Sequence, residues 1–439
     1  MQNSHHRPAQ PPSLPEDSLG YALLAAAELV AEVGAGRTLT DALAALWDAR
    51  PATPSGVRGA ILDLAYSTLR DFGRQDFILG KLLAKPLQEP ARSLLRVALY
   101  RLGSRPEAAH TTVDQAVSAA ATVLGGNFKG VVNGVLRNAL RQHDELAKAA
   151  DADMVAEHRH PPWWIRRLKS QYPQHWRAIL AAGNMHPPMA LRINPLRATL
   201  SETLESFAEA GLAVRELPNG ALLLERPVAV SRVPGFAEGC VSVQDAGAQY
   251  AADYLDLDDG LRVLDACAAP GGKTAHILET ADVILTALDS DAGRARRVTE
   301  NLDRLGLSAK VHTADCRDLE RWWNGRPFDR ILADVPCSAS GVVRRNPDIK
   351  WLRRSDDIAR FAAQQADILE ALWRVLAPGG KMLYATCSVF AEENGDQVAA
   401  FATRHPDCRR IPIGGQLDCQ HLPCPEHDGF FYALLEKVA

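Results

Sequence analysis

Cysteine is absent from the first 239 residues of this 439-residue chain, and all eight cysteines lie at or after Cys240. A secreted disulfide framework would distribute cysteines over the fold, so this pattern favours the reducing cytoplasm. The chain also lacks any run of about 18 apolar residues, which predicts no membrane-spanning helix. Residues 1–18 contain neither a signal-peptide core nor an Arg- and Ser-rich amphipathic pattern, and they predict a disordered tail.

An excess of basic charge is missing as well. The formal net charge of −4 argues against nonspecific coating of nucleic acid, although a local basic groove depends on the distribution of charge and stays possible. Hydrophobic residues make up 47% of the chain and charged residues 23%, which is typical of a globular protein. The length predicts about two or three domains.

Residues 19–145 show apolar positions at three- and four-residue spacing, with short Gly/Pro breaks and no strand-like alternation. This pattern predicts an all-α domain. Arg137 and Arg141 lie on one helix near its end. They form either a solvated helix face or a contact with an RNA backbone.

Residues 146–235 predict a linker followed by a small α+β domain. Residues 144–160 are a polar connection, and the next segment combines Trp163 and Trp164 with Arg166, Arg167 and Lys169. Aromatic and basic side chains together can grip a nucleic acid strand or fasten two domains, and both interpretations stand. Strand-like runs then alternate with a helix before the last predicted domain, residues 236–439.

That last domain is organised around residues 262–274, RVLDACAAPGGKT, which predict a buried strand, a Gly-rich turn and a helix. A phosphate-binding P-loop would need Gly at Cys267, and Pro270 removes an N–H donor, so an NTPase is disfavoured. A nucleoside site on an open α/β sheet fits better. Three more predicted strands end at Asp289, Asp315 and Asp334, although Asp is also a common helix N-cap. Asp289 suits a ribose and Asp315 an adenine edge.

Two cysteines follow the fourth and fifth predicted strands, Cys337 in Pro-Cys and Cys387 in Thr-Cys-Ser. A buried cysteine is usually only a small hydrophobe. At strand ends beside a nucleoside pocket, however, a thiol can serve as a nucleophile.

The motifs DACAAPGGKT, DVPCSASG and YATCS resemble those of S-adenosylmethionine-dependent RNA (cytosine-5)-methyltransferases. The run GNFKGVVNGVLRNAL resembles the end of the NusB fold, an RNA-binding helical module. Together they make the chain similar, over nearly its whole length, to the bacterial 16S ribosomal RNA methyltransferases of the Fmu/Sun type (RsmB family). This resemblance implies a NusB-like helical domain, a small α+β domain and a Rossmann-like methyltransferase domain.

The resemblance also implies a reaction. S-adenosylmethionine would be the methyl donor, S-adenosylhomocysteine the product and ribosomal RNA the partner, with no membrane and no obligate protein partner. Cys387 would add to C6 of cytosine, Asp334 would bind the base edge, and Cys337 would promote release of the adduct. The implied cofactor contacts are Cys267, Ala268, Ala269, Pro270, Gly271, Gly272, Lys273, Asp289, Asp315 and Asp334.

The segment after the Pro-Cys loop is rich in cations. Arg344, Arg345, Lys350 and Trp351 are expected to contact phosphates and stack on bases at the pocket mouth, with a solvated loop as the alternative. Cysteines and histidines recur near the end of the chain, but their spacing is not that of a paired zinc site, and no metal is predicted. Two other functions stay open: an RNA-binding scaffold with an inactive methyltransferase fold, and methylation of another RNA such as tRNA.

Overall fold

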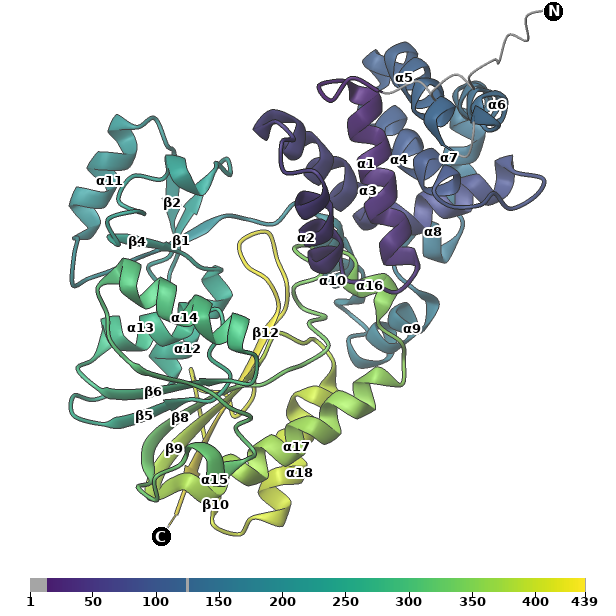
Figure 1. The fold of residues 1–439 in the computed structure, drawn as a ribbon. Helices are drawn as coiled ribbons and strands as arrows, with labels where there is room; N and C mark the ends of the chain where they lie inside the picture. Colours follow the sequence, from purple (N-terminus) through teal and green to yellow (C-terminus); the bar gives the residue numbers. More distant parts are fainter. Residues whose placement is uncertain (1–13, 124–125, 439) are drawn as a thin grey trace, which may run out of the picture. The chain divides into compact units, whose positions relative to one another are not determined.

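The computed structural model describes residues 14–123 and 126–438, so most of the predicted disordered tail, residues 1–13, lies outside the described residues. The described chain forms two compact units (Figure 1). One contains the residues up to Met185 together with Asn346–Arg353, and the other contains His186–Arg345 and Arg354 onwards. Among the described residues, none of the helices has the length and apolar character needed to cross a bilayer.

The first unit is helical, as the periodicity predicts. Its core joins the apolar faces of successive helices, with Leu23, Leu64 and Leu95 all fully buried. Side-chain caps begin several of these helices, such as Ser18 before α1 and Thr38 before α2. Its helices are α1 (Leu19–Gly34), α2 (Leu39–Ala49), α3 (Ser55–Leu82), α4 (Ala91–Ser104), α5 (Ala109–Thr122), α6 (Lys129–Arg141), α7 (His143–Asp151), α8 (Met154–His158), α9 (Pro162–Gln171), α10 (Trp176–Asn184) and α16 (Ile349–Leu352).

The predicted polar connection over residues 144–160 is wrong in its local structure, because α7 and α8 occupy it. Leu146 and Ala150 of α7 are buried against the helical unit, and Asp153 caps α8 by accepting hydrogen bonds from two backbone N–H groups. Each helix is too short for its apolar spacing to stand out in the sequence. Both belong to the helical unit, as do α9 and α10.

The helical unit also includes a segment distant in sequence, Asn346–Arg353. Lys350 is fully buried there and donates to the Arg70 carbonyl at 2.9 Å and to Asn184 Oδ1 at 2.8 Å. The indole N–H of Trp351 donates to the Leu69 carbonyl at 2.9 Å. This segment is therefore a packed part of the helical unit.

The second unit begins with a four-stranded antiparallel sheet in the order β2-β3-β1-β4, packed against Phe207 of α11 (Leu200–Glu209). Its strands are β1 (Ala190–Ile193), β2 (Val214–Glu216), β3 (Leu222–Leu224) and β4 (Val241–Val243). The strand β4 lies beyond residue 235, where the sequence analysis ends the small domain, because its pairing with β1 is not visible in its own three residues.

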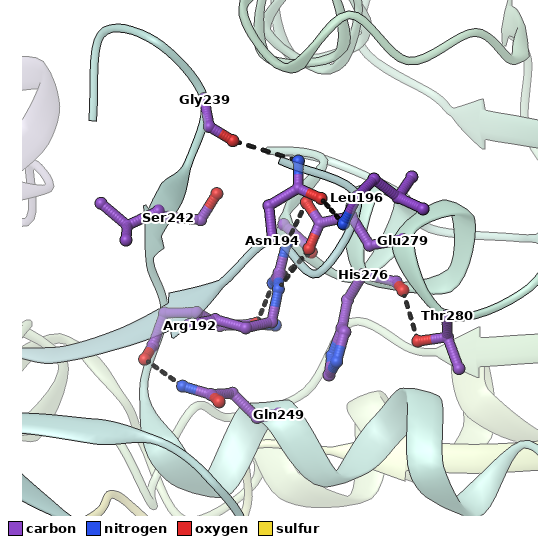
Figure 2. Close-up of polar contacts among 12 residues, drawn as sticks. Arg192, Asn194, Leu196, Gly239, Ser242, Gln249, His276, Glu279 and Thr280 are labelled. Atoms are coloured by element: carbon purple, nitrogen blue, oxygen red, sulfur yellow. Dashed lines mark hydrogen bonds and ion pairs between the residues drawn. The ribbon is translucent and has the colours of Figure 1, made fainter. Parts of the chain in front are cut away.

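Arg192 of β1 links this small sheet to the helix that follows the Gly-rich turn, α13 (Gly272–Thr280) (Figure 2). Its guanidinium forms two hydrogen bonds to Glu279, both 2.9 Å long, and a third to the Gly272 carbonyl at 3.1 Å. Both side chains are almost completely buried, so removing either one would leave an unpaired buried charge.

The larger sheet has the order β10-β12-β9-β8-β5-β6-β7, with β11 paired to β12. Strands β5 to β9 run parallel, and β12 runs antiparallel to β9. The strands are β5 (Arg262–Asp265), β6 (Ile284–Asp289), β7 (Lys310–Thr313), β8 (Phe328–Asp334), β9 (Leu376–Thr386), β10 (Cys408–Ile411), β11 (Cys419–His421) and β12 (Phe430–Lys437).

Helices cover both faces of this sheet (Figure 1). On one face, α12 (Ala246–Tyr254), α13 and α14 (Ala292–Leu305) contribute Ala251, Ile277 and Val298 to the core. On the other, α15 (Leu319–Trp322), α17 (Asp357–Val375) and α18 (Gly395–Arg404) contribute Trp322, Leu369 and Phe401. The strand order reverses at β5, whose neighbours are β6 and β8, and such a reversal opens a crevice at the carboxyl ends of the strands.

Candidate active site at the carboxyl ends of the sheet strands

The Gly-rich turn connects β5 to α13 at the point where the strand order reverses. Gly271 has φ +97°, and a Cβ atom there would come within 3.0 Å of the Val298 Cα. Only glycine fits both the conformation and the space. The turn also bonds to the neighbouring strand, since Ala268 N–H donates to the Leu288 carbonyl at 2.8 Å.

A pocket lies beside this turn. It is lined by Ala266, Cys267, Asp289, Ser290, Arg294, Ala314, Asp315, Cys316, Arg317, Pro336, Gln364 and Ile368. Asp289 is buried at the end of β6 and accepts from the Ala269 N–H at 3.3 Å, while the Arg294 guanidinium lies 3.2 Å from it. Asp315 is more exposed and pairs with Arg317 at 2.7 Å; hydrogen bonds from Arg317 lower the pKa of Asp315. The predicted nucleoside acids thus share one pocket.

Asp334, at the end of β8, lies 2.5 Å from the ammonium of Lys273, at the start of α13. Burial, the largest single influence, opposes the charge on Lys273, but Asp334, Cys387 and Asp265 together outweigh it, so the pKa of the ammonium is raised. Lys273 therefore stays charged, and its charge also interacts with the sulfur of Cys387. Asp265, at the end of β5, accepts a hydrogen bond from Thr274 Oγ1 at 2.7 Å. Burial raises the pKa of Asp265 to about 7.

The two predicted functional cysteines lie together at the ends of adjacent parallel strands. Cys337 Sγ and Cys387 Sγ are 3.4 Å apart. Cys387 is partly exposed, whereas Cys337 is buried. The hydrogen bond to Cys387 and burial both raise the pKa of Cys337 well above that of a free thiol. Cys387 is accordingly the accessible sulfur of the pair.

Three family models match the chain: the NusB family over residues 22–141, the ferredoxin-like domain of RsmF/B-like methyltransferases over 160–231, and 16S rRNA methyltransferase RsmB/F over 252–436. The ribosomal RNA small subunit methyltransferase B of Serratia proteamaculans (strain 568) is 45% identical over 390 residues, which are 87% of this chain and 91% of that protein.

The chain belongs to the RsmB/F family of 16S rRNA methyltransferases.

Two solved structures share the fold of this family member. The crystal structure of PH0851 has a TM-score of 0.79 at 24% identity and covers 98% of this chain and 100% of its own. NSun6 from Pyrococcus horikoshii, solved with SFG, has a TM-score of 0.57 at 20% identity and covers 64% of this chain and 98% of its own. The expected architecture of a NusB-like domain, a small α+β domain and a Rossmann-like methyltransferase domain is confirmed, and the middle domain matches a ferredoxin-like family model.

The residues after Cys337 were predicted to contact phosphates and bases at the pocket mouth, and the structure does not support this role for the buried ones. Arg344 is fully buried and ion-paired with Asp428, and Lys350 is fully buried in the helical unit. Arg345 pairs with Asp428 and with Asp245, the latter at 2.7 Å. Trp351 packs on Phe72 with ring centroids 4.9 Å apart. The prediction is therefore corrected for Arg344 and Lys350, which are buried, whereas Arg345 and Trp351 are partly exposed and their contact with RNA stays a prediction.

Arg137 and Arg141 are exposed on α6; Arg137 donates a hydrogen bond to Asn133 Oδ1 at 2.8 Å, and Arg141 donates one to Asn138 Oδ1 at 3.3 Å. No bound RNA tests their role, which stays a prediction. Cys316, which was not among the predicted site residues, lines the pocket next to Asp315. Its place directly after a strand-end acid was the available signal. In the described part of the chain, no three His, Cys, Asp or Glu side chains come together as metal ligands.

Proposed function

We propose that this enzyme transfers a methyl group from S-adenosylmethionine to C5 of a cytidine in 16S ribosomal RNA, through a covalent bond between Cys387 and C6. The observation that carries the proposal is the placement of Cys387: it is partly exposed, 3.4 Å from Cys337 and within the electrostatic reach of Lys273. The pocket lined by Asp289 and Asp315 also includes Pro336, the residue before Cys337, and a cysteine pair in this position is suited to nucleophilic catalysis on a pyrimidine.

The residues present fit S-adenosylmethionine. A buried carboxylate, Asp289, suits the ribose hydroxyls, and Asp315 suits the adenine edge. The close approach of Gly271 to Val298 leaves no room for a side chain on the turn. The implied contacts are Cys267, Ala268, Ala269, Pro270, Gly271, Gly272, Lys273, Asp289, Asp315 and Asp334. When bound, S-adenosylmethionine supplies an electrophilic methyl group and leaves as S-adenosylhomocysteine.

C5 of cytosine is a poor nucleophile until C6 carries an added group. Cys387 adds as a thiolate to C6, and the C5=C6 electron pair moves onto C5, the carbon that takes the methyl group. The charged ammonium of Lys273 interacts electrostatically with Cys387 at the point of attack. Asp334 binds the cytosine edge and favours protonation of N3, which disperses the charge that develops in the ring.

Release reverses the addition. The proton leaves C5, the electrons of that bond re-form C5=C6, and the C6–S bond breaks with its electron pair returning to Cys387. We assign removal of the C5 proton to Cys337, which lies beside the leaving sulfur. The hydrogen bond that raises the pKa of Cys337 is weakened once Cys387 is a thioether, so in the adduct Cys337 releases its own proton to solvent and its thiolate takes the proton from C5.

RNA is held by exposed cations of the helical unit. Arg137 and Arg141 lie on α6, and α9 and α10 expose Arg166, Lys169 and Arg177. No Asp or Glu occurs between Glu157 and Glu202, so this stretch carries only positive charges in a chain that is negative overall. Trp164 is buried and packs within the unit, which leaves the cations to contact phosphates.

Release of tritium from C5 tests the reaction. With RNA labelled at C5 of cytidine, the enzyme and S-adenosylmethionine should release one tritium per methyl group transferred, because C5 loses its hydrogen in the scheme above. 16S ribosomal RNA should be the substrate and tRNA should not. Methyl transfer without tritium release would show that the acceptor atom is not C5. Cofactor binding without transfer to any RNA would favour an RNA-binding scaffold.

A further inference from the structure

A buried carboxylate lies behind the two cysteine loops. Glu393 ends the short 3-10 helix Ala391–Glu393 and is fully buried. Its oxygens accept four hydrogen bonds, two at each atom. Oε1 accepts from Ser338 N–H at 2.7 Å and from Gln365 Nε2 at 3.2 Å. Oε2 accepts from the hydroxyls of Ser338 at 2.5 Å and Ser388 at 2.6 Å.

The two serines are the residues directly after the two cysteines. Ser338 follows Cys337, and Ser388 follows Cys387. One carboxylate therefore holds the loop of β8 and the loop of β9 at the same time. A backbone hydrogen bond from Gly341 N–H to the Cys387 carbonyl, 2.9 Å long, joins the same two loops. The hydroxyls of Ser338 and Ser388 also lie 3.3 Å apart, and the carboxylate accepts a hydrogen bond from each of them.

A carboxylate suits this position better than an amide. Ionised Glu393 is purely an acceptor, and all four groups that face it can donate. Glutamine would turn an –NH₂ group toward at least two of them. Burial raises the pKa of Glu393, which makes its ionised form costly away from these donors.

The charge of Glu393 also acts on the nearer sulfur. Hydrogen bonding to Cys387, burial and the Cys387 charge raise the pKa of Cys337, and Glu393 adds to this effect. Cys337 therefore keeps its proton in the free enzyme. The carboxylate does not contact the pocket residues or Cys387 Sγ through any hydrogen bond within the described part of the chain.

We propose that Glu393 is a positioning residue that holds Cys337 and Cys387 at the separation that their successive roles require. This inference rests on the function proposed above. The geometry that it fixes is the 3.4 Å separation of the two sulfurs and the direction of each loop relative to the end of its strand.

The test measures the rate of covalent adduct formation. In a Cys337→Ala background, the adduct between Cys387 and RNA should accumulate, and its rate of formation reports attack on C6 alone. Adding Glu393→Gln should lower that rate about 100-fold, the order expected for a misplaced reacting group. In the otherwise native enzyme, Glu393→Gln should lower kcat and leave KM for RNA and the Kd of S-adenosylmethionine unchanged.

Asp396→Asn is the matched control. Asp396 is exposed three residues along the chain, and its variant should form adduct at the rate of the Cys337→Ala parent. If Cys337→Ala alone forms no adduct, the proposed function fails. If the adduct forms and adding Glu393→Gln does not change its rate, the positioning role fails. A variant in which kcat falls, KM and Kd both rise and the melting temperature drops would also overturn the positioning role, since these changes together indicate a general loss of structure.

If Glu393→Gln does not fold, single serine substitutions in the same Cys337→Ala background test the proposal. Ser388→Ala removes the only hydrogen bond between Glu393 and the residue after Cys387 among those described, so it should slow adduct formation about 10-fold. Ser338→Ala should have a smaller effect, because Ser338 N–H still donates to the carboxylate. An unchanged rate in Ser388→Ala would contradict the proposal.

Discussion

Two pairs of cysteines lie at the carboxyl end of the same sheet, and their surroundings differ. Cys337 and Cys387 follow β8 and β9, and the partly exposed Cys387 interacts with the charge of Lys273. Cys267 and Cys316 follow β5 and β7 and line the predicted cofactor pocket. The hydrogen bond between them raises the pKa of Cys267 and lowers that of Cys316.

The comparison shows that a strand-end position alone does not make a cysteine a nucleophile. Burial and the nearby carboxylates of Asp334 and Asp265 further disfavour the anion of Cys267. Cys316 is buried among the pocket residues and takes its hydrogen bond from Cys267. Cys267 is partly exposed as well, so exposure alone does not separate the two pairs; Cys387 is the cysteine of these four that interacts with the ammonium of Lys273 and lies 3.4 Å from the sulfur of Cys337. The same residue type thus has a structural role in one pair and a chemical role in the other.

The largest expected effect comes from replacing the accessible sulfur. Cys387→Ala should lower methyl transfer by about 1000-fold or more, because no group remains to add to C6. Cys316→Ala, from the other pair, is the comparison variant; because Cys316 lines the cofactor pocket it is assayed at saturating S-adenosylmethionine, where kcat should change by no more than about threefold. Methyl transfer to 16S RNA in single-turnover assays checks both. Comparable losses in the two variants would remove the distinction between the pairs.

Asp334→Asn should have the next largest effect. The substitution removes the carboxylate charge that is assigned to the cytosine edge, and it also removes the ion-pair partner of Lys273. We therefore expect kcat to fall about 100-fold. The Kd of S-adenosylmethionine, measured by calorimetry, should change much less than kcat. If the variant loses cofactor affinity and retains kcat, Asp334 belongs to the cofactor pocket alone.

Asp289→Ala should act on binding. Its carboxylate is buried in the pocket of the Cys267–Cys316 pair, and loss of charge-assisted hydrogen bonds to a ribose should raise the Kd of S-adenosylmethionine about 10- to 100-fold. At saturating cofactor, kcat should approach that of the native enzyme. A large loss of kcat at saturation would place Asp289 in the chemical step.

The last expected effect is on stability and not on activity, and it concerns Asp265, which is buried at the end of β5. Burial raises its pKa to about 7, whereas an unfolded Asp titrates near ~3.9. The folded protein therefore binds this proton more tightly, and the free energy of unfolding should fall as pH rises from about 4 to 7. Asp265→Asn should stabilise the protein more at pH 8 than at pH 5, by about 2–3 kcal/mol. Urea unfolding at the two pH values measures this, and equal effects would contradict the buried, protonated carboxyl.

The strands that carry the site could be predicted because each is a short apolar run with a chemically distinctive end. Asp289, Asp334 and Cys387 lie at or directly after their strands as expected. Parallel pairing then brings these ends together, so the pocket follows from local patterns.

The roles of Arg344 and Lys350 could not be predicted, because their partners are distant in sequence. Asp428 lies 84 residues from Arg344, and the Arg70 carbonyl lies 280 residues from Lys350. A cation beside a catalytic motif has the same local sequence whether it faces solvent or a buried carboxylate. Glu393 was missed for the same reason, since Ser338 is 55 residues away.

The most direct measurement is the fate of RNA in the Cys337→Ala variant. Incubated with S-adenosylmethionine and 16S RNA and then denatured, this variant should retain RNA covalently, seen as a shifted band on a denaturing gel. The band should be absent in the Cys337→Ala/Cys387→Ala double variant, and the bond should map to Cys387 by peptide mass. A bond that maps to another residue, or turnover without any retained RNA, would contradict Cys387 as the nucleophile.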